Sequence, residues 1–314
     1  MKRLFPAWVV LGISLASPVA RADYGWIPQY QQLFLRSGID FYSTDQNYNA
    51  TGALEPLTSG GNLHEYRLWL EGEYGIAQDW STRVRLRYVN STLDSQVPGQ
   101  TLAAGSGLSD VTVALKWNLK SDYPIVTTEV FTTIPTSSTT VQAPTQLVLR
   151  DGNFDLGLIL HSGTRAGPFL FSLSPGFVAR LGGYSSAATG EMAVQLSFPK
   201  GFVRGFARGI YSIEDAQPFD ANPLQHTALG SGGSYAKLNG SPRGFSGGAM
   251  IELVPISGFR FGGYLEHVIY GQEYPYFTSF GFDLAYSVDF FSPKKKTKVH
   301  EVPFEGEQPN GFPD

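Results

Sequence analysis

The chain has 314 residues, of which 42% are hydrophobic and only 16% charged, with a net charge of −4 and no cysteine. The net charge argues against nucleic acid as a partner, and the missing thiols exclude a disulfide framework and thiol-ligated metal sites. The 36 glycines, 22 phenylalanines and 16 tyrosines are typical of a large all-β chain.

The first residues have the features of a secretory signal peptide. Lys2-Arg3 precede an apolar segment over 4–16, and Ala20-Arg21-Ala22 follows it. A basic start, an apolar stretch and an A-x-A site predict cleavage near Ala22 and a signal peptide over 1–22. A membrane-anchoring helix is the weaker alternative, because the segment is short and interrupted by proline and serine. Residues 23–30 then form a short periplasmic segment.

The sequence alternates between apolar and polar residues over most of 31–291. A period of two predicts β-strands with one face in an apolar medium and one in a polar medium. About twelve segments carry the pattern, and ten or fourteen strands stay open because the ninth and tenth segments alternate weakly. The segments lie near 32–41, 65–74, 80–88, 110–119, 125–135, 153–161, 169–180, 191–198, 202–211, 249–253, 259–269 and 279–291.

The last segment, 279–291, has the clearest alternation. Its even positions from Phe280 to Phe290 are large and apolar, and its odd positions from Ser279 to Asp289 are small or acidic. A tilted membrane strand needs roughly 9–11 residues, whereas strands of soluble sandwiches are nearer 5–6 residues. The segment also resembles the terminal assembly signal of outer-membrane barrels, which would be carried here by Gly281, Tyr286, Phe290 and Phe291. That resemblance implies the barrel-assembly machinery as a partner.

The connections between the segments alternate in length. Short links lie near 76–79, 120–123, 163–168, 199–201 and 256–258, and long ones near 45–62, 90–107, 136–149, 181–190 and 212–244. Short turns at one end and long loops at the other are typical of outer-membrane barrels. The sequence therefore predicts an all-β fold, a transmembrane antiparallel up-and-down β-barrel over 31–291. The polar residues 292–314 are expected to form a disordered periplasmic tail.

One face of the predicted strands collects the charged residues. A charge on the lipid face would cost about 2–4 kcal/mol at mid-depth, so this face is expected to line the lumen. The two signs are nearly balanced, which does not indicate strong selectivity for one ion sign. The predicted lumen residues are Arg36, Asp40, Glu65, Arg67, Trp69, Glu71, Glu73, Arg83, Arg85, Arg87, Lys116, Glu129, Asp155, Arg180, Arg204, Arg208, Glu252, Arg260, Glu266 and Asp283.

A hairpin turn at Ala77-Gln78 sets the expected pairing of the second and third strands. It places Glu71 opposite Arg83, Trp69 opposite Arg85 and Arg67 opposite Arg87. Arg85 could then also lie over the ring of Trp69.

Groups that could carry out catalysis are few. His161-Ser162 resembles part of a hydrolase motif, and a twelve-stranded outer-membrane phospholipase is a precedent. Adjacent strand residues point to opposite faces, however, so these two cannot form a nucleophile–base pair, and they fall at a predicted turn. The other histidines, His64, His226, His267 and His300, lack the spacing of metal ligands. The sequence predicts no enzyme, no metal and no cofactor.

Several local motifs resemble those of one barrel family. The run 107–117, a strand ending at Ile134-Pro135-Thr136, and the run 152–157 occur in the order found in the outer-membrane barrels named for the MetA-pathway (meta-cleavage) of phenol degradation. The resemblance covers 107–291. In that family a glycine usually follows the Pro-Thr pair and a tryptophan often replaces Phe154, whereas this chain has Ser137 and Phe154.

The family resemblance implies a location in the outer membrane of a Gram-negative bacterium. It further implies a channel or passive transporter for small solutes, with an aromatic compound as the family-level expectation. The expected partners are outer-membrane lipid, the assembly machinery and a small-molecule solute. Two alternatives stay open: a non-conducting barrel with a structural or adhesive role, and a secreted soluble β-protein.

Overall fold

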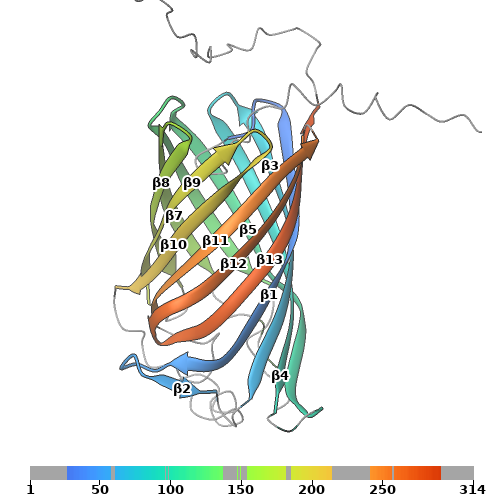
Figure 1. Cartoon of the computed structure of the whole chain (residues 1–314), viewed down its shortest axis with the longest axis vertical. Coiled ribbons are helices and arrows are strands. Elements are labelled where there is room, and N and C mark those ends of the chain that lie inside the picture. Colours follow the sequence, from blue (N-terminus) through green and yellow to red (C-terminus); the bar gives the residue numbers. More distant parts are fainter. Residues whose placement is uncertain are drawn as a thin grey trace, which may run out of the picture.

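The computed structural model describes residues 27–57, 61–95, 97, 99–136, 147, 149, 154–181, 185–213, 241–256 and 258–290. Thirteen strands form a single sheet (Figure 1). They are β1 (Gln32–Tyr48), β2 (Leu54–Pro56), β3 (Asn62–Ala77), β4 (Trp80–Asp94), β5 (Thr101–Lys120), β6 (Ile125–Pro135), β7 (Asp155–Ala166), β8 (Phe169–Arg180), β9 (Ala187–Phe198), β10 (Gly201–Ser212), β11 (Arg243–Ile256), β12 (Phe259–Gln272) and β13 (Tyr274–Asp289).

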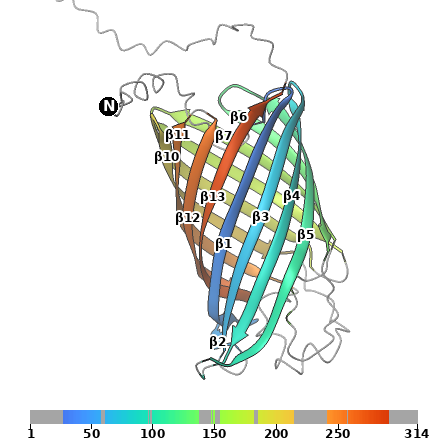
Figure 2. The same ribbon diagram turned by 90° about the vertical axis from the view of Figure 1, so that its right-hand side faces the viewer.

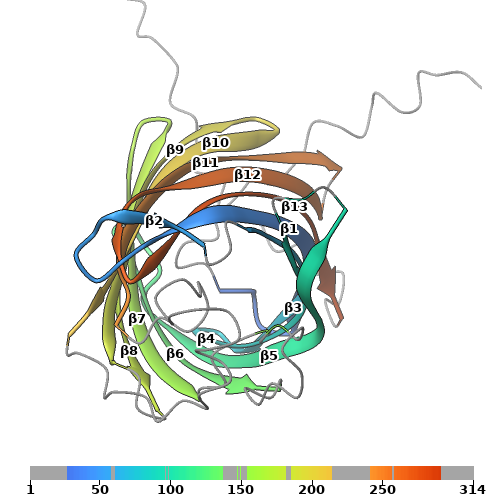
Figure 3. The ribbon, with the colours of Figure 1, turned by 90° about the horizontal axis from the view of Figure 1, so that it is seen from below.

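Twelve of these strands close a barrel. Each pairs antiparallel with its neighbour in the chain, and β13 returns to pair with β1 from Gln32↔Asp289 to Tyr48↔Tyr274. The short β2 pairs only with the far end of β1. The strands form a complete ring when seen along the barrel (Figure 3). The predicted all-β, twelve-stranded antiparallel barrel is confirmed. Within the described ranges, no helix is long and apolar enough to cross a membrane.

The two ends of the barrel differ. One end has the tight turns at 78–79, 121–124, 167–168 and 199–200, and we call it the short-turn end. The other carries β2 and the longer connections, and we call it the long-loop end (Figure 2). The chain enters β1 and leaves β13 at the short-turn end.

Several predicted connections are too long, including those at 45–62 and 181–190, because β1 continues to Tyr48 and β9 begins at Ala187. The expected loop at 90–107 shrinks to 95–100, because β4 continues to Asp94 and β5 already begins at Thr101. Leu93 and Ala103 extend the alternation there and pack into an interior cluster, which stabilises the longer hairpin. The expected link at 163–168 shrinks to 167–168, where Gly167 has a φ of +59° that suits a tight turn.

The outer face of the barrel is apolar. Side chains such as Leu68, Leu70, Phe280, Phe282 and Leu284 are exposed, because alternate residues of each strand point outward. Acidic side chains are buried instead, among them Glu65, Glu71, Glu73, Asp110, Glu129 and Glu252. This distribution is the reverse of that in a water-soluble protein and is typical of a strand barrel in lipid.

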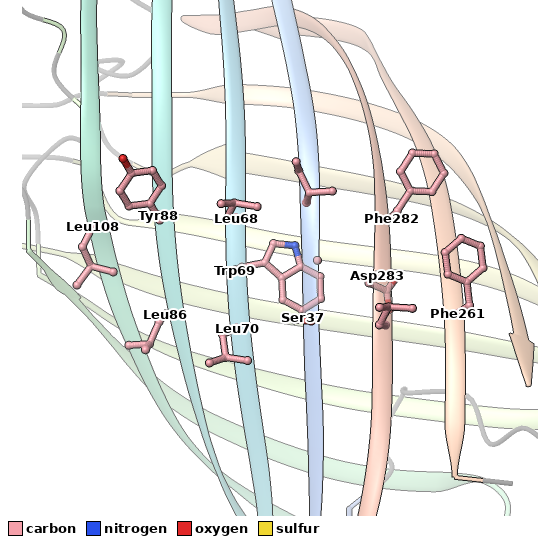
Figure 4. A pocket seen from close by; sticks show the side chains of 13 residues that line it. Ser37, Leu68, Trp69, Leu70, Leu86, Tyr88, Leu108, Phe261, Phe282 and Asp283 are labelled. Atoms are coloured by element: carbon pink, nitrogen blue, oxygen red, sulfur yellow. The ribbon is translucent and has the colours of Figure 1, made fainter. Parts of the chain in front are cut away.

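A depression of about 540 Å³ lies on this outer face above Ser37. Figure 4 shows Leu68, Leu70, Leu86, Phe261 and Phe282 around it. The small Ser37 side chain sits between larger neighbours, so the surface dips there. Its walls are almost wholly apolar, which suits contact with lipid acyl chains.

Several predicted segments fall outside the described residues. They are the signal peptide 1–22, residues 23–26, Phe291, the tail 292–314 and most of the 212–244 connection. Of the predicted assembly signal, Gly281 lies within β13, and Tyr286 and Phe290 are exposed.

Candidate functional site

A stack of charged and aromatic side chains lies on the inner wall of β1, β3 and β4. The indole of Trp69 has the guanidinium of Arg36 at 5.7 Å and that of Arg85 at 5.2 Å from its ring centroid. Its Nε1 donates to Asp40 at 3.2 Å. Arg36 in turn pairs with Asp283 on β13 at 2.7 Å. Cation–π contacts at these distances hold both guanidinium groups in place.

The predicted pairing of β3 with β4 is wrong by two residues. Glu71 lies opposite Arg85 and Glu73 opposite Arg83, whereas Trp69 lies opposite Arg87. The reason is that the turn consists of Gln78 and Asp79, closed by the Ala77–Trp80 pair, with a register shift after Gly75. The expected contact of Arg85 with Trp69 nevertheless forms, because diagonal neighbours are within reach of long side chains.

Glu71 forms ion pairs with two arginines of β4. Arg85 donates to it at 2.7 Å, and Arg83 approaches it at 3.5 Å.

Two interior ion pairs reach across an intervening strand. Arg83 on β4 pairs with Glu129 on β6, and the strand between them presents the small Ala114 at that level. Lys116 on β5 pairs with Glu73 on β3 at 2.7 Å, across Ser81 of β4. Strands two apart are separated by about 9–10 Å, which only long side chains can bridge. A small residue on the middle strand leaves room for the bridge.

The opposite wall repeats the arrangement on β9 to β12. Arg204 and Arg208 both donate to Glu191. Arg208 also reaches Glu266 on β12 at 2.8 Å, and Ser246 on β11 donates to the same carboxylate at 2.6 Å. The charges of this wall are therefore linked across four strands.

The remaining predicted lumen residues have separate partners. Glu252 lies 3.5 Å from Arg260, whose guanidinium covers the ring of Phe34. Arg87 and Asp110 approach to 3.5 Å.

Asp155 and Arg180 lie directly opposite each other on β7 and β8. The structure therefore brings most of the predicted lumen residues into two networks, one on each wall.

Aromatic rings on the inner face lie over glycines of neighbouring strands. A Cβ at Gly38 would lie 2.5 Å from Cζ2 of Trp69, and one at Gly248 would lie 2.4 Å from Cζ of Phe206. The ring in each case fills the space that a side chain would need. The glycines thus let bulky rings lie against the wall instead of projecting into the interior.

An apolar cluster occupies the interior at the long-loop end. Its buried members are Tyr42, Leu57, Leu63, Leu93, Ala103 and Leu147, and Leu102 and Phe277 pack against it. Leu57 follows β2, and Leu147 belongs to the β6–β7 connection, where its N–H donates to the Ala104 carbonyl at 3.0 Å. Below the cluster, the guanidinium of Arg67 covers the ring of Tyr42 at 4.6 Å and pairs with Glu65. We call the apolar cluster, without Arg67 and Glu65, the apolar mouth.

A hydrogen-bonded chain of His161, Ser174 and Glu129 was missed by sequence reasoning. His161 Nδ1 lies 3.1 Å from Ser174 Oγ, and its Nε2 lies 3.3 Å from Glu129 Oε2. The sequence places His161 at a turn, which is wrong because β7 continues to Ala166. Pairing β7 with β8 about the 167–168 turn would have put His161 opposite Ser174.

The order serine, histidine, carboxylate is also that of serine hydrolases. In those enzymes the carboxylate stabilises the protonated histidine. Here Arg83 already pairs with Glu129, so the negative charge is largely compensated. The contacts favour a structural role in which His161 joins β6, β7 and β8. Among the described residues, no group of three or more His, Asp or Glu side chains could hold a metal ion.

Comparisons with known proteins bear on the fold. No protein-family model and no curated protein matches the sequence, so the resemblance to the phenol-degradation family stays a prediction. Among solved structures, the chain is similar to the COG4313 outer membrane channel from Pseudomonas putida F1, with a TM-score of 0.66 and 12% identity over 86% of this chain and 100% of that chain.

Two further structures are less similar. The translocator domain of autotransporter NalP from Neisseria meningitidis has a TM-score of 0.45 and 10% identity over 89% of this chain and 92% of that chain. The NanC porin has a TM-score of 0.46 and 9% identity over 81% of this chain and 98% of that chain. The closed twelve-stranded ring and the similarity to the COG4313 channel agree: the fold of this chain is that of an outer-membrane β-barrel.

Proposed function

We propose that the protein is an outer-membrane channel that lets small solutes pass by diffusion. The observation that carries the proposal is that charged side chains on the inner face of the barrel border open space that can hold water. Arg85 and Arg87 project to the inside, and about a third of each side chain is exposed. A sealed interior would leave such groups without solvent, and their desolvation would be costly. Stepwise conductance of the refolded protein in a planar bilayer tests the proposal directly.

The apolar mouth supports an aromatic or otherwise apolar body in the solute. Leucine side chains and the rings of Tyr42 and Phe277 form the interior at the long-loop end. Such a lining favours compact apolar groups over hydrated ions. This agrees with the solute class implied by the family resemblance. The same cluster is what favours the alternative of a non-conducting barrel, so the conductance measurement separates the two.

Polar substitutions in the apolar mouth should increase ion flow. Leu57→Ser or Leu147→Ser would make the apolar mouth more polar and let water enter it, so the single-channel conductance in potassium chloride should rise severalfold. Uptake of an aromatic solute into liposomes should not rise in proportion. Leu57→Met and Leu147→Met serve as controls, because they keep the region apolar. Unchanged conductance in both serine variants would mean that the apolar mouth does not limit ion flow.

The proposed location is the outer membrane, after cleavage near Ala22. The assembly signal around Gly281, Tyr286 and Phe290 would deliver the chain to the barrel-assembly machinery, and the apolar outer face would contact lipid. The protein should sediment with outer membranes. It should also stay folded in cold SDS and change its gel mobility on boiling. A soluble periplasmic protein with identical mobility before and after heating would refute the location.

A further inference from the structure

Most interior ion pairs share one orientation, with the basic side chain more exposed than the acidic one. In each of three pairs on the β3–β5 wall, the acidic side chain is buried against the strands and the arginine side chain is partly exposed toward the interior. The exposed side-chain fractions are 31% for Arg85 against 7% for Glu71, 37% for Arg87 against 2% for Asp110, and 32% for Arg67 against 2% for Glu65. The signs of the interior residues are balanced in number, but they are not balanced at the surface that a solute meets.

On the opposite wall, the most exposed ion pairs have the same orientation. Arg208 is 43% exposed, whereas its partners Glu191 and Glu266 are 15% and 10% exposed. Arg36 and Arg260 are also more exposed than the carboxylates they contact. Arg204 is the reverse case, because it is more buried than Glu191. In this case Arg204 shares the Glu191 carboxylate with the more exposed Arg208.

The orientation has a structural cause. Glutamate side chains are shorter than those of arginine, and serines of neighbouring strands hold them at the wall. Ser91 donates to Glu65 at 2.5 Å, and Ser246 donates to Glu266 at 2.6 Å. Arginine carries its charge at the end of a longer chain, so its guanidinium lies nearer the barrel axis.

A wall lined in this way attracts anions. Each pair is a dipole with its positive end toward the axis, and dipoles that point inward around a cylinder raise the potential inside it. Guanidinium groups also donate two parallel hydrogen bonds that match a carboxylate. Resting on the channel function proposed above, we infer that the interior is an anion-selective path and that its solutes are small organic carboxylates. The apolar mouth suits the uncharged body of such a molecule.

Arg85 and Arg87 are the groups best placed to meet the solute. They are two residues apart on β4, so both face the interior about 7 Å from each other along the strand. Trp69 supports the guanidinium of Arg85 from one face. Because that group is held before any solute arrives, little ordering of the side chain is needed on binding.

The first test is the reversal potential of the refolded protein in a gradient of potassium chloride. The wild-type channel should prefer anions. In the double variant R85Q/R87Q the anion-to-cation permeability ratio should fall severalfold. R165Q is the matched control: Arg165 donates to the Gly167 carbonyl at the short-turn end and belongs to neither network. Its loss of one charge should change the ratio far less.

The second test uses benzoate and benzamide, which have nearly the same size and differ in charge. Benzoate should enter proteoliposomes faster than benzamide relative to empty liposomes, and R85Q/R87Q should lose this advantage. Folding of each variant is checked by its mobility in cold SDS, and R208Q on the other wall replaces the double variant if that one does not fold.

The outcomes distinguish a failure of the anion path from a failure of the channel function. A wild-type channel that conducts but prefers cations, or neither sign, overturns the anion path and leaves the channel function standing. Conduction with an anion preference that R85Q/R87Q and R208Q both leave unchanged overturns the role of the guanidinium surface. A folded protein without any conductance overturns the channel function itself.

Discussion

Replacing Glu129 by alanine is expected to lower the free energy of unfolding by about 3–5 kcal/mol, the usual cost of removing one partner from a buried ion pair. Glu129 is 2% exposed and pairs with Arg83 and His161, and Lys116 lies directly opposite it on β5. Without this carboxylate, Arg83 loses its shortest ion pair, and the repulsion between Arg83 and Lys116 is compensated only by Glu71 and Glu73 in a poorly hydrated part of the wall. Urea unfolding of the refolded barrel, followed by tryptophan fluorescence, measures the loss.

Glu71→Ala is the matched comparison. Its carboxylate is also buried, but its main partner Arg85 is 31% exposed. Water can solvate Arg85 once Glu71 is gone, so the loss should be about 1 kcal/mol or less. The same change should shift the reversal potential further toward anions. Large losses of unfolding free energy in both variants, with no conductance before or after the substitution, would favour the alternative of a non-conducting barrel.

The second large effect is expected at Gly38. A Cβ at this position would lie 2.5 Å from the Trp69 ring and 2.7 Å from the Phe282 carbonyl oxygen. The ring can swing away, but the carbonyl belongs to the paired strand β13 and cannot. Gly38→Val should therefore cost about 1–3 kcal/mol, the range for overpacking. It should also push the indole into the lumen and reduce the single-channel conductance.

Gly205→Val is the control for this experiment. No atom lies within 4 Å of a Cβ built at Gly205 on β10, so the change in unfolding free energy should stay within about 0.5 kcal/mol. Tryptophan emission should shift in the Gly38 variant and not in the control. Equal stability of the two variants would show that β1 and β13 can separate enough to admit a side chain.

The barrel could be predicted because the pattern of each strand is local. Side chains from Phe280 to Phe290 alternate strictly, and a period of two fixes which face each residue joins. The positions of the turns were harder to predict from the sequence. The hairpin between β3 and β4 turns at Gln78-Asp79, one residue later than predicted, and this displacement of the turn moves every partner by two residues. No feature of the alternation marks such a shift.

The sequence predicted which residues lie on the inner face, but it did not predict which of them form contacts. Alternation placed Arg83 and Glu129 on the inner face of the strands, but their contact crosses β5 and depends on the small size of Ala114. Contacts of this kind depend on the curvature of the wall and on rotamers. The greater exposure of Arg208 relative to Glu266 has the same origin. Counting charges therefore gave a balanced lumen, whereas in most described ion pairs the basic side chain is the more exposed partner.

The seam between β1 and β13 has a consequence for how this protein can be made. Every other barrel pairing joins neighbours along the chain, but this one joins Gln32 to Asp289. Until β13 has paired with β1, the assembling sheet has two open edges whose backbone groups have no partner, and lipid offers them none. Truncation before β13 should therefore yield an aggregating or degraded chain instead of a smaller pore. Conversely, joining the ends of the barrel and cutting at the 199–200 turn should give a permuted chain that still closes, because the ring itself has no first strand.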